Sequence, residues 1–377
     1  MKSILLFGLF LLSQIFVAQI KGHVQDEGNR SVKGVSIYID GSTISTLSDE
    51  NGNFNLQTSI KNGNLIIKKE DYSKIIFPVK DALGKNLKVI LQKEKLIEEV
   101  NLIPYNDKDF ERNFSIFQYA FLGDTNSTKI LNKKDLLFAV DRKNNIFRAK
   151  AKKPLIIENE NLGYTIIFDL MNFEKRPQSL TYNGTSLFKE MPGNERKQNK
   201  YKKKREEAFI GSATHFFQSL YAGKTKENGF NVNLVKIISN PNYPSALEMK
   251  TLENYVNNLL TQGRNISTEA MPAHIKAISE RAENPKTFLS ILKTSIPESD
   301  YSFRKNNKLY LKSDNLLQIV YTTKNKKIID TLVDTDGQEF EIFPDGYYEN
   351  PDQLIFNGTW GDYKVSKMLP TNFYLVK

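Results

Sequence analysis

The densest group of chemically capable side chains in the sequence is a basic run between positions 196 and 205. Seven cations in ten residues create a local positive potential, which salt screens within about 8–10 Å. Such a run suits contact with the phosphates of lipopolysaccharide or with an acidic partner, although a charge run more often forms a solvated loop. We name it as a candidate anionic-surface contact. Its members are Arg196, Lys197, Lys200, Lys202, Lys203, Lys204 and Arg205.

A serine and a histidine are the next residues whose types suggest chemistry. Gly211-Ser212-Ala213-Thr214-His215 places Ser212 and His215 three residues apart, close together on a helix. The segment lacks the Gly-x-Ser-x-Gly pattern of a nucleophile elbow, and no orienting acid is identifiable. We therefore expect a packed or capping histidine and name no catalytic residue.

Metal chemistry has little material to use. The sequence contains no cysteine and no His-Glu-x-x-His pattern. Asp49, Asn51 and Asn53 resemble a calcium loop, but an EF-hand needs glycine at its sixth position and glutamate at its twelfth. Gly52 is fourth and Ile60 is twelfth, so we expect a plain β-turn. We expect no metal site, no phosphate-binding glycine loop and no cofactor. The three histidines are isolated from one another: His23, His215 and His274.

The elements that position these residues begin with a run of short strands. In Ile20–Leu56, apolar side chains at 35, 37 and 39 alternate with Ser36, Tyr38 and Asp40, the pattern of a strand with one buried face. Asn51-Gly52 predicts a tight hairpin turn. Further strands are predicted at Leu65–Lys69, Lys74–Val79 and Leu87–Leu91. We predict a β-sandwich over residues 19–94.

This stretch resembles the carboxypeptidase-regulatory-like domain, a small transthyretin-like β-sandwich common in Bacteroidetes envelope proteins. The resemblance covers residues 20–92 and implies an accessory module without peptidase activity. It rests on Gly22-x-Val24-x-Asp26, Val32-Lys33-Gly34-Val35, Gly41-Ser42-Thr43 and Thr46-x-Ser48-Asp49-x-Asn51-Gly52-x-Phe54.

The remainder is similar to the long region that follows this module in Bacteroidetes proteins. That similarity implies no catalytic residue to carry over. It rests on Phe117-x-x-Ala120-Phe121-Leu122-Gly123, on Pro154-Leu155-x-Ile157-x-Asn159-x-Asn161-Leu162-Gly163-Tyr164, and on Gly211-Ser212-x-x-His215-Phe216-Phe217-x-Ser219-Leu220.

The first residues have the features of a secretory signal. Lys2 is followed by an apolar run from Ile4 to Val17 and by the small residue Ala18, which suits a cleavage site. The run is shorter than the roughly 20 residues of a membrane span. We predict a signal peptide over residues 1–18 and a protein exported to the periplasm, the cell surface or the medium. Without cysteine it is not a lipoprotein.

The net charge of +10 raises the question of nucleic acid, and the signal peptide argues against it. An anionic outer-membrane or cell-wall surface is a more available partner. The lysine and asparagine content also fits a base-composition effect of the genome, which we weight more heavily. We expect an envelope protein or a cell-surface glycan as partner, no nucleic acid, and no transmembrane span after signal cleavage.

A length of 377 residues favours two domains. We predict a linker at 95–105 and an α+β domain at 106–377 with an antiparallel sheet and several helices. Its first helix, Asn106–Leu122, places four aromatic rings at helical spacing, which indicates a core-facing stripe rather than an aromatic ligand platform. Those rings are Phe110, Phe114, Phe117 and Phe121.

Hairpins and further helices follow. Asn183-Gly184 is the strongest short hairpin signal of the chain and predicts a turn between strands Leu180–Tyr182 and Ser186–Lys189. The basic run leads into a predicted helix at Glu206–Ala222. Additional predicted elements are strands at Leu136–Val140, Ile146–Lys150, Leu155–Ile157, Tyr164–Leu170, Phe230–Ile238, Lys308–Leu311, Leu316–Thr322, Lys327–Leu332, Glu339–Phe343 and Gln353–Asn357, a helix capped by Ser245, and a helix at Ala273–Ala282.

Together these features favour a non-enzymatic, envelope-associated protein with a β-sandwich accessory module and an α+β body that binds a partner or ligand. The alternative is a periplasmic hydrolase of peptide or glycan. Its carboxylate pair would be set by spatial separation, which sequence spacing does not reveal.

Overall fold

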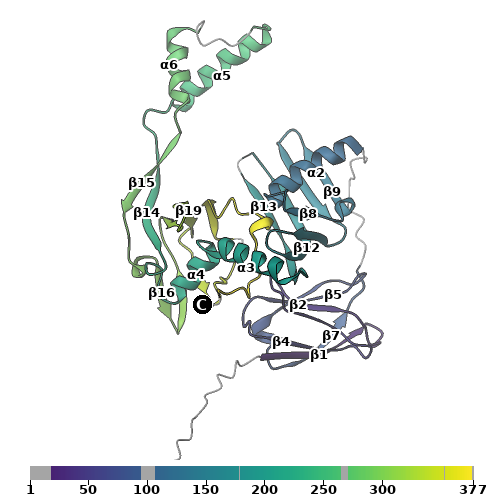
Figure 1. Cartoon of the computed structure of the whole chain (residues 1–377). Helices are drawn as coiled ribbons and strands as arrows, with labels where there is room; N and C mark the ends of the chain where they lie inside the picture. The colour runs from purple at the N-terminus through teal and green to yellow at the C-terminus, as the bar shows by residue number, and fades with distance from the viewer. Residues whose placement is uncertain (1–17, 95–106, 178, 265–270, 352, 376–377) are drawn as a thin grey trace, which may run out of the picture. The chain divides into compact units, whose positions relative to one another are not determined.

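The computed structural model describes residues 18–94, 107–177, 179–264, 271–351 and 353–375 (Figure 1). Its chain forms two compact units, which are described separately. Unit 1 is 1–222, 342–349 and 359–377, and unit 2 is 223–341 and 350–358. The predicted linker at 95–105 and all of the predicted signal peptide except Ala18 lie outside the described residues, so those domain boundaries stay predictions. Among the described helices, none combines the length and apolar character needed to cross a membrane.

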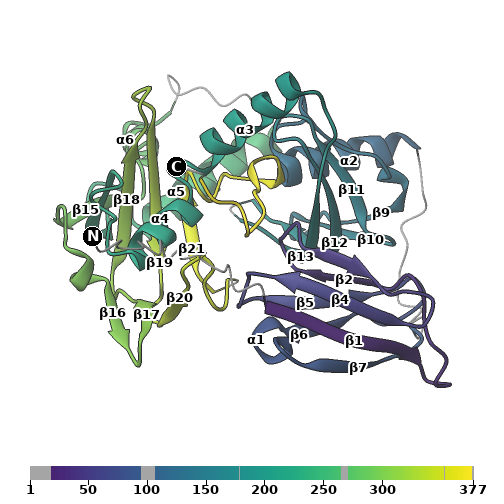
Figure 2. The same cartoon turned by 60° about the horizontal axis from the view of Figure 1, so that its bottom comes forward.

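The N-terminal part of unit 1 is the predicted β-sandwich (Figure 2). One sheet has the order β4-β1-β7 and the other β3-β2-β5-β6. β4 alternates exposed and buried residues along its whole length, the period of a strand with one core face. The core between the sheets contains Ile20, Val24, Ile37 and Leu56. The elements are β1 (Ala18–Asp26), β2 (Ser36–Ile39), β3 (Ser45–Leu47), β4 (Asn53–Thr58), β5 (Asn64–Lys68), β6 (Ile75–Pro78), α1 (Val79–Ala82) and β7 (Asn86–Leu91).

The calcium-like loop is a turn. One carboxylate oxygen of Asp49 accepts hydrogen bonds from the backbone N–H groups of Asn51 and Asn53, at 2.9 and 2.8 Å. Gly52 adopts a φ of +75°, the left-handed conformation that Asn-Gly turns need. Turn geometry therefore accounts for these residue types.

The second part of unit 1 is a mostly antiparallel sheet covered by one helix. The strand order is β8-β11-β12-β10-β9, and β13 pairs with the other edge of β12. α2 lays its predicted aromatic stripe on this sheet, where Phe117 packs 4.8 Å from the ring of Phe173. The core-face prediction is confirmed. The elements are α2 (Asp107–Leu122), β8 (Thr128–Ile130), η1 (Lys133–Asp135), β9 (Leu136–Asp141), β10 (Ile146–Ala151), β11 (Leu155–Asn159), β12 (Tyr164–Lys175) and β13 (Leu180–Glu190).

The hairpin predicted at Asn183-Gly184 is wrong. β13 continues through both residues and pairs with β12 from Tyr164↔Glu190 to Lys175↔Leu180, with one register shift between Leu170 and Asn172. Gly184 does not adopt the positive φ that a type I′ turn needs. Its missing side chain instead permits close approach, because a Cβ at this position would clash with the Asp169 carbonyl and lie 2.6 Å from the Phe168 ring.

The helix predicted at Glu206–Ala222 is also wrong in its bounds. The basic run is itself helical in α3 (Glu195–Phe209), and a separate α4 (Ala213–Tyr221) follows. The break lies at Gly211, whose φ is +77°, and the indole N–H of Trp360 donates to the Gly211 carbonyl at 2.8 Å. Ser212 then caps α4.

The sandwich packs directly on the larger sheet through the outer face of β2 and β5. Tyr38 is 5% exposed, not on a solvent face as its alternation predicts, because it packs with Ile66 against Ile167 and Leu187. Its hydroxyl lies 3.2 Å from that of Thr185.

Buried polar contacts support the same interface. The Asp169 carboxylate contacts the ammonium groups of Lys68 and Lys74 at 2.7 and 2.8 Å. Burial raises the pKa of Asp169, but the hydrogen bonds and charges of the two lysines outweigh burial and hold it below its ordinary value. The Ser186 N–H donates to Asp40 at 2.7 Å.

Unit 2 is built on a five-stranded sheet of order β15-β14-β18-β19-β21, with a small β16-β17-β20 sheet and two helices. Ser245 forms the predicted cap of α5 through a capping box with Glu248. The sequence did not indicate β15. The elements are β14 (Phe230–Ser239), α5 (Ala246–Thr261), α6 (Ala273–Ala282), β15 (Thr287–Lys293), η3 (Glu298–Asp300), β16 (Ser302–Lys305), β17 (Lys308–Leu311), β18 (Leu316–Thr322), β19 (Ile328–Asp334), β20 (Phe340–Ile342) and β21 (Ile355–Gly358); η4 (Val365–Lys367) belongs to unit 1.

The continuous β12–β13 pair predicts a sharp cost for a side chain at position 184. Gly184→Ala should lower the free energy of unfolding of unit 1 by about 1–3 kcal/mol, because its Cβ meets backbone. The control Gly193→Ala should cost less, since the nearest neighbours of its Cβ are side-chain carbons of Lys197 at 3.0–3.2 Å. Urea unfolding followed by the fluorescence of Trp360, the single tryptophan, measures both. Equal stability of the two variants would contradict the uninterrupted strand.

Candidate functional site

The basic run forms the third helix of unit 1, with one face turned inward. Asn194 caps the helix by accepting from the Lys197 N–H, and Tyr201, Arg205 and Phe209 are buried at four-residue spacing. The seven cations predicted from the sequence therefore have unequal environments, set by their positions around the helix.

Arg205 is not available to a surface partner. Its side chain donates to the carbonyls of Leu162 and Gly163 at 2.7 and 3.0 Å and to the Glu190 carboxylate at 3.0 Å. Its guanidinium lies 3.8 Å from the centre of the Tyr164 ring. Arg205 fastens α3 to the start of β12, so its predicted role in surface contact is replaced by a structural one.

Two further cations have partners within the helix. Lys204 forms an ion pair with Glu207 at 2.6 Å, and the hydrogen bond from Lys204 lowers the pKa of Glu207. Lys197 lies 5.6 Å from the centre of the Tyr201 ring. Lys204 is therefore partly neutralised, while the exposed Lys197 takes part in no described salt bridge.

Of the four remaining cations, Lys202 lines a pocket described below, and the other three are aligned on the exposed side of the helix. Arg196, Lys200 and Lys203 occur at positions i, i+4 and i+7, all are exposed, and no described ion pair involves them. They span about 10 Å along the helix axis at 1.5 Å per residue. We call Arg196, Lys200 and Lys203 the basic stripe.

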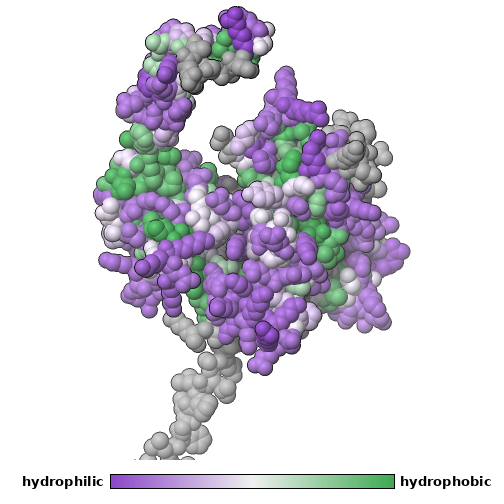
Figure 3. All heavy atoms as spheres, turned by 45° about the horizontal axis from the view of Figure 1, so that its top comes forward, coloured by the Kyte–Doolittle hydropathy of each residue, from purple (hydrophilic) through white to green (hydrophobic). Residues whose placement is uncertain are grey.

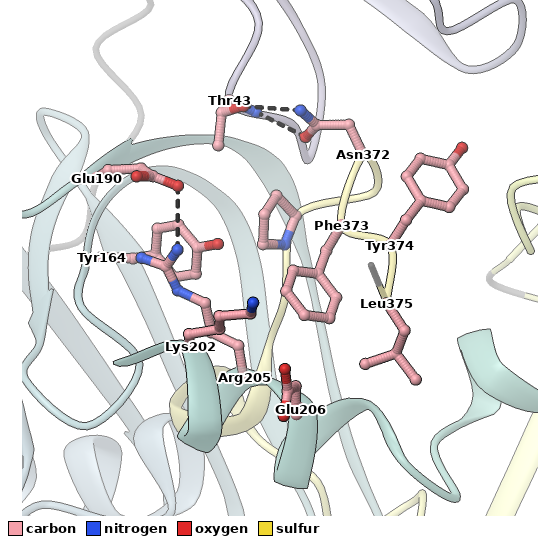
Figure 4. Close-up of a pocket in the computed structure, with 11 residues that line it drawn as sticks. Thr43, Tyr164, Glu190, Lys202, Arg205, Glu206, Asn372, Phe373, Tyr374 and Leu375 are labelled. Carbon is pink, nitrogen blue, oxygen red and sulfur yellow. Dashed lines mark hydrogen bonds and ion pairs between the residues drawn. The ribbon is translucent and has the colours of Figure 1, made fainter. Parts of the chain in front are cut away.

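A pocket of about 270 Å³ lies beside this helix (Figure 4). Lys202 and Glu206 reach it from α3, Tyr164 and Glu190 come from the ends of β12 and β13, and the segment 370–375 closes one side. Asn372 is tied to Thr43 by two hydrogen bonds, at 3.1 and 2.8 Å. The full lining is Thr43, Tyr164, Glu190, Lys202, Arg205, Glu206, Pro370, Asn372, Phe373, Tyr374 and Leu375.

The chemistry of the pocket is mixed. It holds the ammonium of Lys202, two carboxylates and several aromatic rings, and burial raises the pKa of Tyr164 to about 12, so its phenol stays protonated at neutral pH. One carboxylate, that of Glu190, already accepts from Arg205. Because the second, Glu206, would repel an anion, the pocket does not extend the anion-binding character of the stripe.

The pocket could not have been found from the sequence. Its lining residues come from five segments between positions 43 and 375, and no local motif links them. Gly163 is the one local signal. A Cβ there would overlap the Tyr201 ring, so the glycine allows α3 to approach β12.

The Ser212–His215 pair has the predicted capping arrangement. The Ser212 hydroxyl accepts from the His215 backbone N–H at 3.2 Å, while the imidazole Nδ1 accepts from the Gly211 N–H at 3.1 Å. The ring packs 5.1 Å from that of Phe209, and burial lowers the pKa of His215 to about 4. Across the described residues, no group of three or more His, Asp or Glu side chains is arranged to hold a metal ion.

The buried imidazole predicts a pH dependence of stability. The folded protein keeps His215 neutral, whereas the unfolded chain protonates it below about 6.5, so its contribution is lost as the pH falls from about 6.5 toward 4. We expect unit 1 to lose about 1–2 kcal/mol more stability between pH 7 and pH 5 than His215→Gln loses. Urea unfolding followed by Trp360 fluorescence measures this difference. His274→Gln, at an exposed position, is the control and should keep the wild-type dependence. An unchanged dependence in His215→Gln would contradict the neutral buried ring.

Comparison with known proteins supports the N-terminal module. Residues 20–102 match the family model described as CarboxypepD_reg-like domain, which covers less than a quarter of the chain. No curated protein matches the sequence. Among solved structures, the crystal structure of BcpA, the major pilin subunit of Bacillus cereus, aligns with 90% of this chain and 83% of that chain, at 9% identity and a TM-score of 0.15, too low to support any argument. The chain thus carries a CarboxypepD_reg-like β-sandwich followed by a larger α+β region.

Proposed function

We propose that the protein is an exported, non-enzymatic binding protein that contacts a phosphate-bearing surface of the cell envelope through the basic stripe. The observation that carries this proposal is the alignment of Arg196, Lys200 and Lys203 on one exposed helix face, where no described salt bridge involves them. The CarboxypepD_reg-like module supports an accessory rather than a catalytic role.

Helical order makes the stripe a better anion contact than a solvated loop. In a loop each cation moves independently, whereas α3 is capped at Asn194 and fastened by Arg205, so the three cations are held along one line. Each Lys or Arg near an anionic membrane surface contributes about 1 kcal/mol. Three such residues give about 3 kcal/mol, which favours reversible, salt-sensitive retention at a surface rather than tight recognition of one ligand.

The hydrolase alternative is supported less well, because one of the two carboxylates in the pocket beside α3, that of Glu190, is already paired with Arg205. It requires two carboxyl groups that face one cleft, one with a raised pKa. Burial raises the pKa of Asp40 and of Asp345, but both accept backbone hydrogen bonds, from Ser186 and from Tyr347 respectively. These contacts give Asp40 a structural role at the interface between the sandwich and the larger sheet, and Asp345 a structural role in its own turn.

Neutralising the stripe should weaken binding to anionic membranes. We expect Arg196→Gln/Lys200→Gln/Lys203→Gln to lower the affinity for mixed phosphatidylcholine–phosphatidylglycerol vesicles about 100-fold, the equivalent of about 3 kcal/mol. Flotation with vesicles at low and physiological salt measures the change, and purified lipopolysaccharide provides a second anionic probe.

The control for this test is a triple variant with the same change of charge. Lys324→Gln/Lys326→Gln/Lys327→Gln neutralises three exposed lysines near the β18–β19 turn of unit 2 and should leave binding intact. Equal losses in both variants would mean that net charge alone governs binding. Unchanged binding in the stripe variant would remove α3 as the contact.

A further inference from the structure

An apolar ribbon stands out in unit 2. The first residues of β14 pair with β18, but Lys236–Ser239 pair only with β15, so the two strands continue beyond the rest of the sheet as a ribbon between that sheet and the α5–α6 pair (Figure 1). Apolar side chains gather on this part of the surface (Figure 3). The ribbon's exposed apolar residues are Ile237 (51% exposed), Ile238 (42%), Phe288 (44%), Leu289 (40%), Ile291 (55%) and Leu292 (48%).

Both faces of the ribbon are apolar. Ile237 pairs with Leu289 and the adjacent Ile238 with Phe288, and neighbouring positions of a strand point to opposite faces. An antiparallel sheet with one solvated face shows alternation of apolar and polar residues, whereas strands with apolar residues on both faces are typical of sheets that are covered on both sides. The ribbon therefore lacks the polar face that a solvated strand normally has.

In the described structure, β15 is an edge strand. It pairs with β14 alone, so its other edge presents backbone N–H and C=O groups to any incoming strand. Edge strands are usually protected by inward charges, proline or short length. β15 has seven residues and a single charge, Lys293, at its last position.

The sequence of β15 is complementary to itself. A two-fold axis normal to the sheet keeps each side chain on its own face of the sheet. In antiparallel pairing of two copies, the numbers of two directly opposed residues must therefore add up to an even number. With Ser290 opposite Ser290, Phe288 faces Leu292 and Leu289 faces Ile291 of the second copy. Shifting the register by two residues in either direction places Ser290 opposite Phe288 or Leu292, which breaks the match.

The same register also keeps the lysines of the two copies apart. Lys293 faces Thr287 of the second copy, and Lys286 faces Thr294. No lysine stands opposite another lysine, an arrangement that would be destabilising between directly paired strands. Apolar positions meet apolar positions, and both charges meet hydroxyl side chains.

We propose that the protein forms a homodimer by antiparallel pairing of β15 with β15 of a second copy, centred on Ser290. The product is a continuous β14-β15-β15-β14 sheet. Because the two β15 strands run in opposite directions, the α5–α6 pair of one copy lies beside the Lys293 end of β15 in the other copy. That end is about 20 Å from the Thr287 end of the same strand, at 3.3 Å per residue. Two seven-residue edges bury less area than the roughly 1,000 Å² of a stable interface, so we expect micromolar affinity.

Cross-linking tests the central pair. The chain has no cysteine, so Ser290→Cys introduces a single thiol, and directly opposed residues of antiparallel strands lie about 4.5–5.5 Å apart between Cα atoms, within disulfide range. Mild oxidation of the full chain should yield a covalent dimer. Asn325→Cys, in the β18–β19 turn, should remain monomeric under the same conditions.

Charge exchange tests the register. Leu289→Lys or Ile291→Glu alone should shift the protein to monomer in sedimentation equilibrium, at least tenfold in dissociation constant. The double variant places each new cation opposite a new anion of the second copy and should restore the dimer. Ile328→Lys, at a 62% exposed position outside the ribbon, is the control and should not change the dissociation constant.

Three outcomes would overturn the proposal. The first is a wild-type chain that stays monomeric throughout the micromolar range. The second is a dimer that Leu289→Lys leaves intact, which would place the interface elsewhere. The third is a monomer whose β15 edge is filled by a strand from another protein, detected as protection of that partner's amides from hydrogen exchange.

Discussion

Unit 1 depends on the uninterrupted pairing of β12 with β13. β12 pairs with β10, β11 and β13 and contacts the helix α2, the sandwich and Arg205 of α3. Its inward side chains, including Phe168 and Phe173, form the aromatic core under α2. Its outward side chains, Ile167 and Asp169, meet the sandwich, and its first residue, Tyr164, lies under the guanidinium of Arg205. A hairpin at Asn183-Gly184 would remove the partner of this strand at its middle.

Local sequence patterns correctly predicted the elements that are determined by interactions within a few residues. The aromatic stripe of α2, the Ser245 cap, the sandwich strands and most late strands follow from periodicity and turn chemistry within a few residues. Gly184 shows where this reasoning fails. Asn-Gly favours a type I′ turn in isolation, but the glycine is needed for close approach to Asp169, fifteen residues earlier, and only the paired strand reveals that contact. The pocket beside α3 depends on still more distant segments, so sequence reasoning missed it entirely.

The basic run shows how a fold divides one charged motif between two tasks. Composition treats seven cations alike, yet helical geometry turns Arg205 inward, where two carbonyls and Glu190 compensate its burial. Lys204 is balanced by Glu207 three residues later. The stripe remains because Arg196, Lys200 and Lys203 occupy the opposite face. The buried arginine orders the helix, and that order keeps the exposed cations aligned; the structural and the surface roles therefore depend on each other.

Alternation along the sequence fails to explain the apolar residues of two regions, the outer face of the sandwich and the β14–β15 ribbon. The same physical argument applies to both. Tyr38 and Ile66 lie on the outer face of the sandwich, where alternation predicts solvent, and they are buried because Ile167 and Leu187 of another sheet cover them. The β14–β15 ribbon has the same kind of residues on both faces, at 40–55% exposure, without a cover among the described residues. Edge pairing brings the four large apolar residues of β15 against the same residues of a second copy, and each Å² of apolar surface that this removes from water contributes about 25 cal/mol. At the outer face of the sandwich, the apolar residues are covered by another part of the same chain. For the ribbon, the palindromic order of the apolar residues of β15 about Ser290 is the feature that makes a second copy the matching partner of its edge.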